Sequence, residues 1–383
     1  MTSRERIIKT LKHKGRADRV PWTFNFGATQ GFNPTLLRNY KTSRQIHGPI
    51  CEHFDYDIFM VLDPDRFSPL DIETKQEKVG LEAIVGGVKL IANGIDKNEY
   101  FDAASLPPGG YLDAWGIYHV PWPTDPTFEI YHPPLQNIRD LARIRAFPSP
   151  VLDNDSLARA KEDVELIRSL DKISTCYSGS VYEWSWNIRG QERFFLDLYD
   201  QPEAIREIVE KISTFVLDLA LSLQEAGVDM LAFYDDFGQQ DRLQISREAW
   251  RTFIKPAWRK VWSKVKQQNP DTIIFLHSCG HITEVIEDLI EIGVDVIHPI
   301  QPEAMNVYEI ADRYRDDVAL WGTISCQKTL PLGSPTDVEK EIKERIDKIG
   351  SRGGLVISPA NIMGPDVPLD NIDAFQKACR SYC

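Results

Sequence analysis

Short apolar runs alternate with longer helical patterns from about residue 155 to the end of the chain. The apolar runs read "ISTCYSG", "VDMLAFYDD", "TIIFLHSC", "VDVIHP", "VALWGTIS" and "LVISPA". Helical patterns lie around them at 155–170, 190–199, 202–226, 246–268, 282–292, 304–314, 335–349 and 369–381. Continuous apolar runs of this length are typical of parallel strands buried on both faces, so the chain is constrained to an α/β fold.

Two earlier runs, "VPWTFNF" and "IFMVL", bring the expected number of strands to eight. We therefore predict a (β/α)8 TIM barrel rather than a doubly wound sheet. No Gly-x-Gly-x-x-Gly fingerprint follows any run, which disfavours a dinucleotide-binding sheet. In the joints "EAGVDMLAF" and "EIGVDVIHP", Gly227 and Gly293 are expected to end the preceding helix in the left-handed conformation.

The pattern between Pro21 and Pro150 is irregular and rich in proline, glycine and aromatic residues, as in "SLPPGGYLDAWGIYHVPWP". The run "EAIVGGVKLIAN" predicts a hairpin. No linker-like composition separates this region from the regular part that follows. We interpret residues 1–383 as a single barrel, in which an N-terminal irregular stretch at about 64–135 is an insertion or lid.

The composition excludes several classes of partner. The net charge is -13 at pH 7, and an acidic surface repels nucleic-acid phosphates and anionic membranes. No stretch approaches the roughly 20 apolar residues that a membrane-spanning helix needs, and the N-terminus has no apolar signal sequence. We expect a cytoplasmic protein whose 6 cysteines are thiols or metal ligands, because a reducing compartment disfavours disulfides.

In a barrel, chemistry is concentrated where strands end and helices begin. The run "IIFLHSC" ends on His277, Ser278 and Cys279. Alternate side chains of an extended segment share a face, so His277 and Cys279 should point the same way. Imidazole nitrogen and thiolate sulfur are preferred zinc ligands, and Cys326 at another strand end could complete three ligands with one position open. The alternative is a buried, hydrogen-bonded histidine beside an inert thiol.

Carboxylates near other strand ends are candidate catalytic groups. Asp235 and Asp236 follow the run "MLAFY", and Glu183 lies in "VYEWSWNIRG". Carboxyl groups in such places can transfer a proton, bind a metal or hold a substrate, whereas their structural alternative is a helix cap or an ion pair. Four neighbouring side chains are candidates for substrate binding: Tyr234, Gln239, Trp184 and Trp186. The alternative for the two tryptophans is packing in the core, which is common for this residue type.

Four segments together resemble the uroporphyrinogen decarboxylase superfamily in collinear order. They read "MTSRERIIKTLKHKGRADRVPW", "FLHSCGHITEVIEDLIEIGVDVIHPIQPEAMN", "WGTISCQKTLPLGSPTDVEKEI" and "ISPANIMGPDVPLDNI". The similarity covers nearly the whole chain. It implies a (β/α)8 barrel with its site at the C-terminal face. This superfamily contains both decarboxylases and cobalamin-dependent methyltransferases that work with methylcobamide and coenzyme M.

The resemblance favours the methyltransferase branch. True decarboxylases carry an arginine-rich segment near the N-terminus that grips the carboxylates of a porphyrinogen, whereas this chain has no arginine between Arg19 and Arg38. The methyltransferase branch holds zinc with a His-x-Cys motif and a distant cysteine, and the segment "LHSCG" matches the first part.

The third zinc ligand of the methyltransferase branch falls in the segment that matches "SPANIMGP", where this chain has Asn361. We infer that Cys326 could replace it, and that Asn361 is a candidate for substrate binding. A zinc ion with two thiolates and an imidazole activates a substrate thiol, so the departure weakens the case for thiol methylation.

The resemblance therefore implies a zinc-dependent methyltransferase that moves a methyl group between a small methylated compound, or a thiol, and cobalamin. The chain shows no D-x-H-x-x-G segment for binding cobalamin, so we expect a partner corrinoid protein to carry it. A methoxylated aromatic is one candidate substrate, since a carboxyl group or the metal could polarise its leaving oxygen. Aromatic residues of the insertion could line a pocket for such a ring, or they could simply cover the hydrophobic core. These residues are Tyr111, Trp115, Tyr118 and Trp122.

Two other functions stay open at this stage. One is a decarboxylase-like lyase acting on a smaller carboxylic acid, with Asp236 stabilising a protonated intermediate. The other is a binding barrel without catalytic activity. The sequence names neither the substrate nor the direction of transfer, and it permits a homodimer without specifying one.

Overall fold

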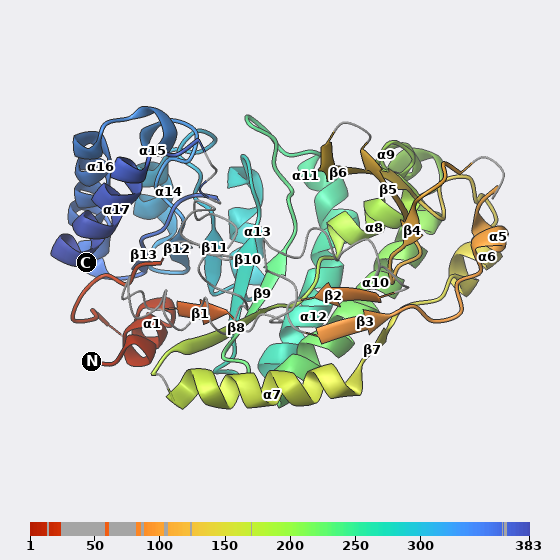
Figure 1. Ribbon diagram of the computed structural model, residues 1–383, viewed down its shortest axis with the longest axis horizontal. Coiled ribbons are helices and arrows are strands. Elements are labelled where there is room, and N and C mark those ends of the chain that lie inside the picture. Colours follow the sequence, from red (N-terminus) through yellow and green to blue (C-terminus); the bar gives the residue numbers. More distant parts are fainter. Residues whose placement is uncertain are drawn as a thin grey trace.

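The computed structural model is built around one parallel sheet (Figure 1). It describes residues 1–13, 15–23, 58–60, 82–85, 88–102, 106–122, 125–169, 171–361, 363 and 366–383. The sheet has 7 strands in the order β1-β8-β9-β10-β11-β12-β13, and every pair is parallel. The strands are β1 Ile58–Met60, β8 Ile173–Tyr177, β9 Met230–Tyr234, β10 Ile273–His277, β11 Val296–His298, β12 Ala319–Trp321 and β13 Leu355–Val356.

The strand predictions after residue 170 are confirmed, and the run "IFMVL" supplies β1. The other early candidate, "VPWTFNF", contributes a parallel bridge between Trp22 and Ile357, next to β13. The described pairings thus form a half-barrel that runs from the Trp22 bridge to β1. Pairing between the Trp22 segment and β1 would close an eight-stranded ring, and none is found among the described residues. The closed (β/α)8 barrel therefore stays a prediction.

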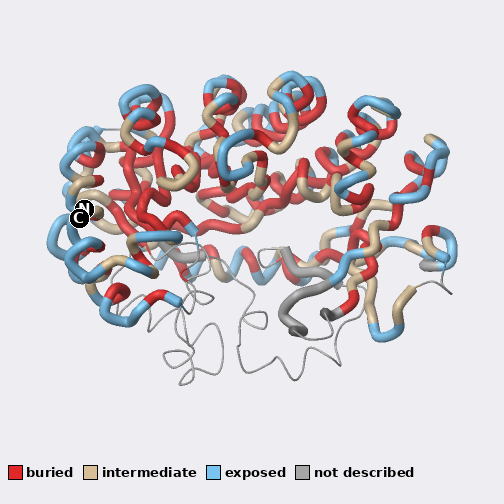
Figure 2. Tube along the Cα trace, turned by 90° about the horizontal axis from the view of Figure 1, so that it is seen from above, coloured by how far each residue is buried: buried red, intermediate tan, exposed pale blue. Residues whose placement is uncertain are grey.

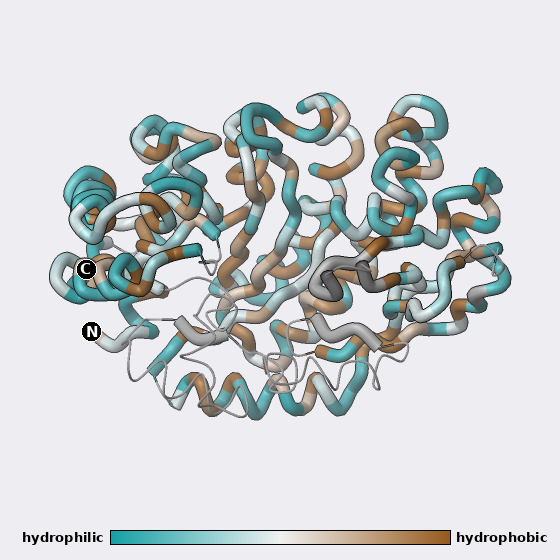
Figure 3. Tube along the Cα trace, turned by 45° about the horizontal axis from the view of Figure 1, so that its top comes forward, coloured by the Kyte–Doolittle hydropathy of each residue, from teal (hydrophilic) through white to brown (hydrophobic). Residues whose placement is uncertain are grey.

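Helices follow the strands and cover the outer face of the sheet, so the strands are buried and the outer turns are exposed (Figures 1 and 2). Hydrophobic residues accordingly concentrate in the strands and hydrophilic ones on the outer helix faces (Figure 3). Gly227 and Gly293 have φ angles of 92° and 104° and end their helices as predicted. None of the helices in the described part of the chain has the length and apolar character needed to span a bilayer.

The helices of the regular part agree with the predicted ranges, except for those at Tyr182–Arg189 and Thr329–Leu332, which the sequence patterns do not predict. They are α7 Asn154–Ser169, α8 Tyr182–Arg189, α9 Gln191–Asp200, α10 Pro202–Glu225, α11 Arg247–Ala249, a π-helical turn Trp250–Ile254, α12 Lys255–Gln268, a 3-10 turn Thr283–Val285, α13 Ile286–Glu291, α14 Val307–Tyr314, α15 Thr329–Leu332, α16 Pro335–Lys348, a 3-10 turn Gly350–Arg352 and α17 Leu369–Tyr382.

The irregular region forms two small antiparallel sheets on the side of the molecule opposite the C-terminal helices (Figure 1). The predicted hairpin in "EAIVGGVKLIAN" is confirmed as β2–β3. The elements are β2 Glu82–Val85, β3 Val88–Ile91, α5 Lys97–Tyr100, β4 Tyr111–Leu112, β5 Tyr118–Trp122, β6 Asp125–His132, α6 Leu141–Ala146 and β7 Val151–Leu152. The bounds of the insertion at about 64–135 stay a prediction, since residues 61–81 lie outside the described residues.

Successive residues of each central strand alternate between two cores. In β9, Met230 and Ala232 belong to an inner core enclosed by the sheet, whereas Leu231 and Phe233 face an outer core shared with the helices. The same alternation runs through β10. Both faces are thereby removed from water, which is why the strands read as continuous apolar runs. The parity of a residue also decides whether it faces the interior of the half-barrel.

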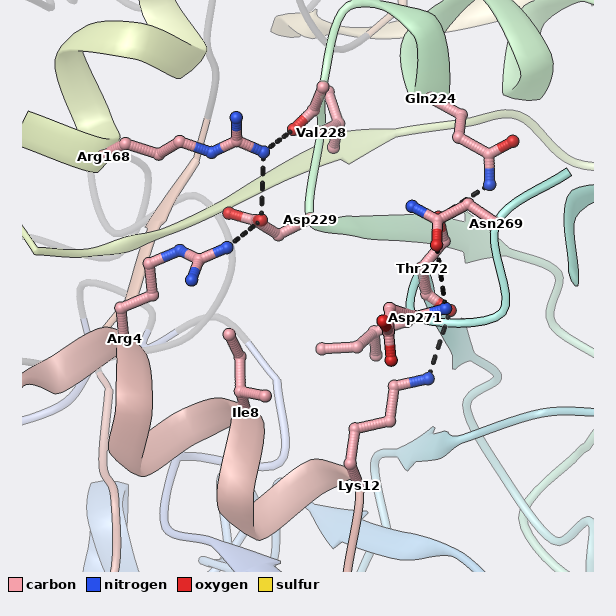
Figure 4. A pocket seen from close by; sticks show the side chains of 12 residues that line it. Arg4, Ile8, Lys12, Arg168, Gln224, Val228, Asp229, Asn269, Asp271 and Thr272 are labelled. Atoms are coloured by element: carbon pink, nitrogen blue, oxygen red, sulfur yellow. Dashed lines mark hydrogen bonds and ion pairs between the residues drawn. The ribbon is translucent and has the colours of Figure 1, made fainter. Parts of the chain in front are cut away.

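The N-terminal helix closes the inner core at the end where the strands begin. Ile7 of α1 (Ser3–Leu11) is buried in that core. Arg4 donates to Asp229 at 2.6 Å, and Lys12 reaches backbone carbonyls just before β10 (Figure 4). These side chains line a cavity of about 320 Å³ beneath the sheet. Because α1 closes this end, the opposite end is the one available for a site.

A buried ion pair ties the irregular region to the helices beside that opposite end. Arg189, at the end of α8, donates from Nε at 2.8 Å and from Nη2 at 2.5 Å to Asp197 of α9. Neither side chain has any exposed surface. Arg189 also donates to the carbonyls of Leu135 and Ile138, which precede α6. These bonds fix α8, the helix that carries Glu183.

Asp197→Asn should lower the free energy of unfolding by about 3 to 5 kcal/mol, because it removes the charge that compensates a buried guanidinium. Denaturant titration measures this change. Asp200→Asn is a matched control on the same helix, since the side chain of Asp200 is 63% exposed and should contribute little. Equal losses in the two variants would contradict the role assigned to the buried pair.

Candidate functional site

Three adjacent strands direct side chains of the same parity to one point at the mouth of the half-barrel. In β10 the inner face ends at His277 and continues beyond the strand to Cys279. In β9 the same face ends at Tyr234 and continues to Asp236. The parallel register pairs His277 with Tyr234 on one side and with His298 of β11 on the other.

Asp236, His277 and Cys279 form a compact cluster whose possible ligand atoms all lie within 4.8 Å of one another. The Cys279 N–H donates to Asp236 Oδ1 at 2.7 Å. His277 Nε2 lies 3.5 Å from the same oxygen and 3.4 Å from Cys279 Sγ. All three residues are partly exposed, so the cluster opens to the mouth.

Two glycines allow the loops that carry these groups to touch. A Cβ added at Gly238 would lie 2.6 Å from the backbone nitrogen of His281, and one added at Gly280 would lie 2.5 Å from the carbonyl oxygen of Gln239. Gly280 also has a φ of 82°, in the left-handed region. Any larger residue at either position would push the two loops apart.

His277 is held on two sides. Its ring stacks on Tyr234 with a centroid distance of 4.7 Å and an interplanar angle of 19°. On the other side, its Nδ1 lies 2.8 Å from Nδ1 of His298. Burial lowers the pKa of His277, with Asp236 opposing, and burial and the neighbouring His277 lower the pKa of His298 well below its ordinary value. Both rings are therefore neutral at pH 7.

The two predicted sulfur ligands lie on either side of Asn361. The Asn361 Nδ2 donates to Cys279 Sγ at 3.3 Å, and Cys326 Sγ lies 3.2 Å from both the backbone nitrogen and the carbonyl oxygen of Asn361. Burial raises the pKa of Cys279 to about 12 and that of Cys326 to about 11, so both are thiols until a cation stabilises the thiolate. Cys326 lies outside the three-residue cluster, whereas Asp236 lies inside it.

Asp235 points away from the mouth into the outer core. Its fully buried carboxylate accepts hydrogen bonds from the Ser180 hydroxyl, from Trp258 Nε1 at 2.9 Å, and from the backbone N–H groups of residues 181–183. Burial raises the pKa of Asp235 to about 6, and these donors oppose the rise. The placement favours the helix-cap interpretation of Asp235, because the carboxylate sits at the positive end of α8.

Glu183 lies on the first turn of α8 next to Asp236, whose backbone N–H donates to the Glu183 carboxyl group. Burial and the charges of Asp236 and Asp235 raise the pKa of Glu183 to about 9. The carboxyl group is also close enough to raise the pKa of Cys279. A carboxyl group that stays protonated at pH 7 can act as a general acid.

The candidate tryptophans lie behind the site. Trp184 packs against Trp115 at 5.6 Å and against Tyr177 at 6.1 Å, and Tyr177 packs edge-on against Tyr234 at 5.1 Å. An aromatic row thus leads from the irregular region to the ring stacked on the imidazole. Trp186 packs against the outer core.

The aromatic candidates of the insertion mostly pack against other side chains and do not line the site. Trp115 and Tyr118 are each 3% exposed. Tyr111 stacks on His119, and the side chain of Trp122 lies outside the described residues. This favours the hydrophobic-cover interpretation of the insertion aromatics. Gln239 is exposed, and its side-chain oxygen accepts from Arg242 at 3.4 Å.

The donor set of the cluster fits a zinc ion. Carboxylate oxygen, imidazole nitrogen and thiolate sulfur are all zinc ligands, and three protein ligands leave a fourth position for a substrate or water. Asp236, His277 and Cys279 present these three donors from adjacent loops. From the sequence, Asp236 is a candidate catalytic group and His298 has no assigned role. Both follow from counting alternate residues along β9 and β11.

Residues 129–382 match the uroporphyrinogen decarboxylase (URO-D) family, and the chain belongs to that family. Similar curated proteins include uroporphyrinogen decarboxylases from Geotalea daltonii, 24% identical over 178 residues, and from Chloroherpeton thalassium, 23% identical over 180 residues. These alignments cover 45% and 46% of this chain and 48% of each relative. The chain thus spans about half the length of the curated relatives it matches.

A solved structure of a methyltransferase from Methanosarcina mazei is similar over the whole chain. The match covers 100% of this chain and 99% of the other, with a TM-score of 0.62 and 16% sequence identity. At this identity the likeness establishes a common fold. Together with the family match, it confirms the predicted relationship to the uroporphyrinogen decarboxylase superfamily.

The two adjacent aspartates should respond differently to the same substitution. Asp235→Asn should lower the free energy of unfolding by about 2 to 3 kcal/mol, because it removes the charged acceptor of several buried donors. Asp236→Asn should change stability little, since its side chain is 35% exposed, and should weaken zinc binding instead. Denaturant titration and competition with a chromophoric chelator measure the two effects.

Cys279→Ala is the control that should also lose zinc affinity. If Asp236→Asn bound zinc as tightly as the unmodified protein, Asp236 would not be a ligand.

Proposed function

We propose that this chain is a methyltransferase that moves a methyl group between a small methylated compound, or a thiol, and cobalamin on a separate corrinoid protein. The proposal rests on one observation: Asp236, His277 and Cys279 form a cluster beside the carboxyl group of Glu183, whose raised pKa keeps it protonated at pH 7. Membership of the URO-D family and the whole-chain likeness to a methyltransferase support the proposal. The lack of arginine between residues 19 and 38 argues against a porphyrinogen substrate.

Asp236, His277 and Cys279 would hold the metal, and their arrangement prepares them for it. The Cys279 N–H orients the Asp236 carboxylate, and Tyr234 fixes the plane of the His277 ring. Zinc, when bound, supplies a Lewis acid that polarises a heteroatom or lowers the pKa of a substrate thiol. Asn361 donates to Cys279 Sγ, and we expect its side chain to contact a substrate bound beside that sulfur.

Glu183 supplies the proton that the leaving oxygen needs when a methyl ether is demethylated. The bond between the methyl carbon and the oxygen breaks as the methyl group passes to the reduced corrinoid, and the oxygen takes the proton from Glu183. The leaving group therefore departs as a neutral alcohol. General acids typically accelerate such steps by about 10²- to 10⁴-fold.

Purified protein incubated with cob(I)alamin and a panel of methoxyarenes, methylamines and methyl thioethers should form methylcobalamin with at least one donor, which absorbance spectroscopy detects. Methylcobalamin with a panel of thiols tests the reverse direction. Cys279→Ala should abolish the reaction in either direction. No methyl transfer with any compound would reject the proposed function.

A lyase that acts on a smaller carboxylic acid is the second candidate, favoured by the similarity to uroporphyrinogen decarboxylases. Release of carbon dioxide from a panel of small carboxylic acids, without methyl transfer, would identify this activity instead.

Methyl transfer from an ether should decline as the pH rises through about 9, because Glu183 loses its proton there. Glu183→Gln should reduce turnover by about 10²-fold or more at pH 7 and should not show this decline. Glu192→Gln, an exposed position on α9, is the matched control and should behave as the unmodified protein. A Glu183→Gln variant with the original pH profile would contradict the role of Glu183.

A further inference from the structure

We propose that His298 is a positioning residue that sets the tautomer of His277, so that His277 presents an unprotonated Nε2 to Asp236 and Cys279. The inference rests on the metal site of the proposed function. His298 is buried, and it is neither a proposed metal ligand nor the proposed general acid.

The two Nδ1 atoms of His277 and His298 can share only one proton between them. His277 and His298 are register partners on neighbouring strands, and their Nδ1 atoms lie 2.8 Å apart. A neutral imidazole carries one N–H, so at this distance one ring donates and the other accepts. If His277 donates from Nδ1, its Nε2 keeps a lone pair. If His277 accepts instead, its proton lies on Nε2 and faces Asp236 at 3.5 Å, where it blocks coordination.

The neighbour of His277 Nε2 favours the first arrangement. Cys279 is a thiol, and its S–H can donate to an unprotonated Nε2 across the 3.4 Å between Sγ and that nitrogen. The His298 ring is fully buried and packs against Phe275 at 5.5 Å and Trp321 at 6.3 Å. A Cβ added at Gly322 would lie 2.6 Å from its Cδ2 atom. Such close packing holds the ring in the orientation that faces His277.

A histidine that binds a metal normally donates its other N–H to a carboxylate, a carbonyl or water, and loss of that partner typically costs 10- to 100-fold in metal affinity. His298 would fill this position with a neutral acceptor. It therefore orients His277 without adding negative charge to a mouth that already contains the carboxyl groups of Asp236 and Glu183.

The test compares His298→Leu with His298→Asn in the full chain, using zinc alone. The Asn side chain can place an oxygen near the position of Nδ1, whereas Leu offers no acceptor. His298→Leu should bind zinc about 10- to 100-fold more weakly than the unmodified protein in chelator competition, and His298→Asn should recover most of that loss. Equal weakening in both variants, or none in His298→Leu, would overturn the proposal.

Nitrogen-15 NMR of the imidazole groups in the metal-free, unmodified protein gives a second measurement that needs no variant. His277 should be the Nδ1–H tautomer and His298 the Nε2–H tautomer. The opposite assignment would overturn the proposal even if His298→Leu failed to fold. Neither measurement involves methyl transfer, so a protein that binds zinc as expected but transfers no methyl group would reject only the proposed function.

Discussion

Burial of both faces of the central strands determines which side chains can reach the mouth of the half-barrel. Along β9 and β10, alternate residues enter the inner core or the outer core, and the alternation continues one or two residues past each strand. His277 therefore lies inside, whereas Asp235 lies among the helices. The chemistry of the site depends on this parity, because a shift of one residue would exchange every inward group for an outward one.

Most of the regular fold could be predicted from the sequence, because parallel strands buried on both faces leave uninterrupted apolar runs. The six strands after residue 170 and most helices between them appear at the predicted positions, whereas the short helices α8 and α15 are not predicted. The structure of the irregular region is harder to predict from the sequence, because its short antiparallel strands do not leave uninterrupted apolar runs. Trp115 and Tyr118 are nearly fully buried, and composition alone does not distinguish a tryptophan in a core from one that lines a ligand.

The sequence also identified His277 and Cys279, since an H-x-C at the end of a strand is visible in one dimension. The remaining partners depend on neighbours in space. Asp235 and Asp236 have the same side chain, and they differ only in which face of β9 they extend. Cys326 was assigned by its residue type, yet Asn361 lies between it and Cys279. His298 becomes visible only when the register between β10 and β11 is known.

The N-terminal helix has a consequence for the order in which the molecule is completed. Ile7 and Leu11 share the inner core with Val356, so segments that are far apart in the sequence meet there. During translation α1 is synthesised before β13, and the apolar surface on which α1 packs is incomplete until β13 has also been made. The apolar face of α1 therefore stays without part of its final packing partner while the residues between α1 and β13 are synthesised.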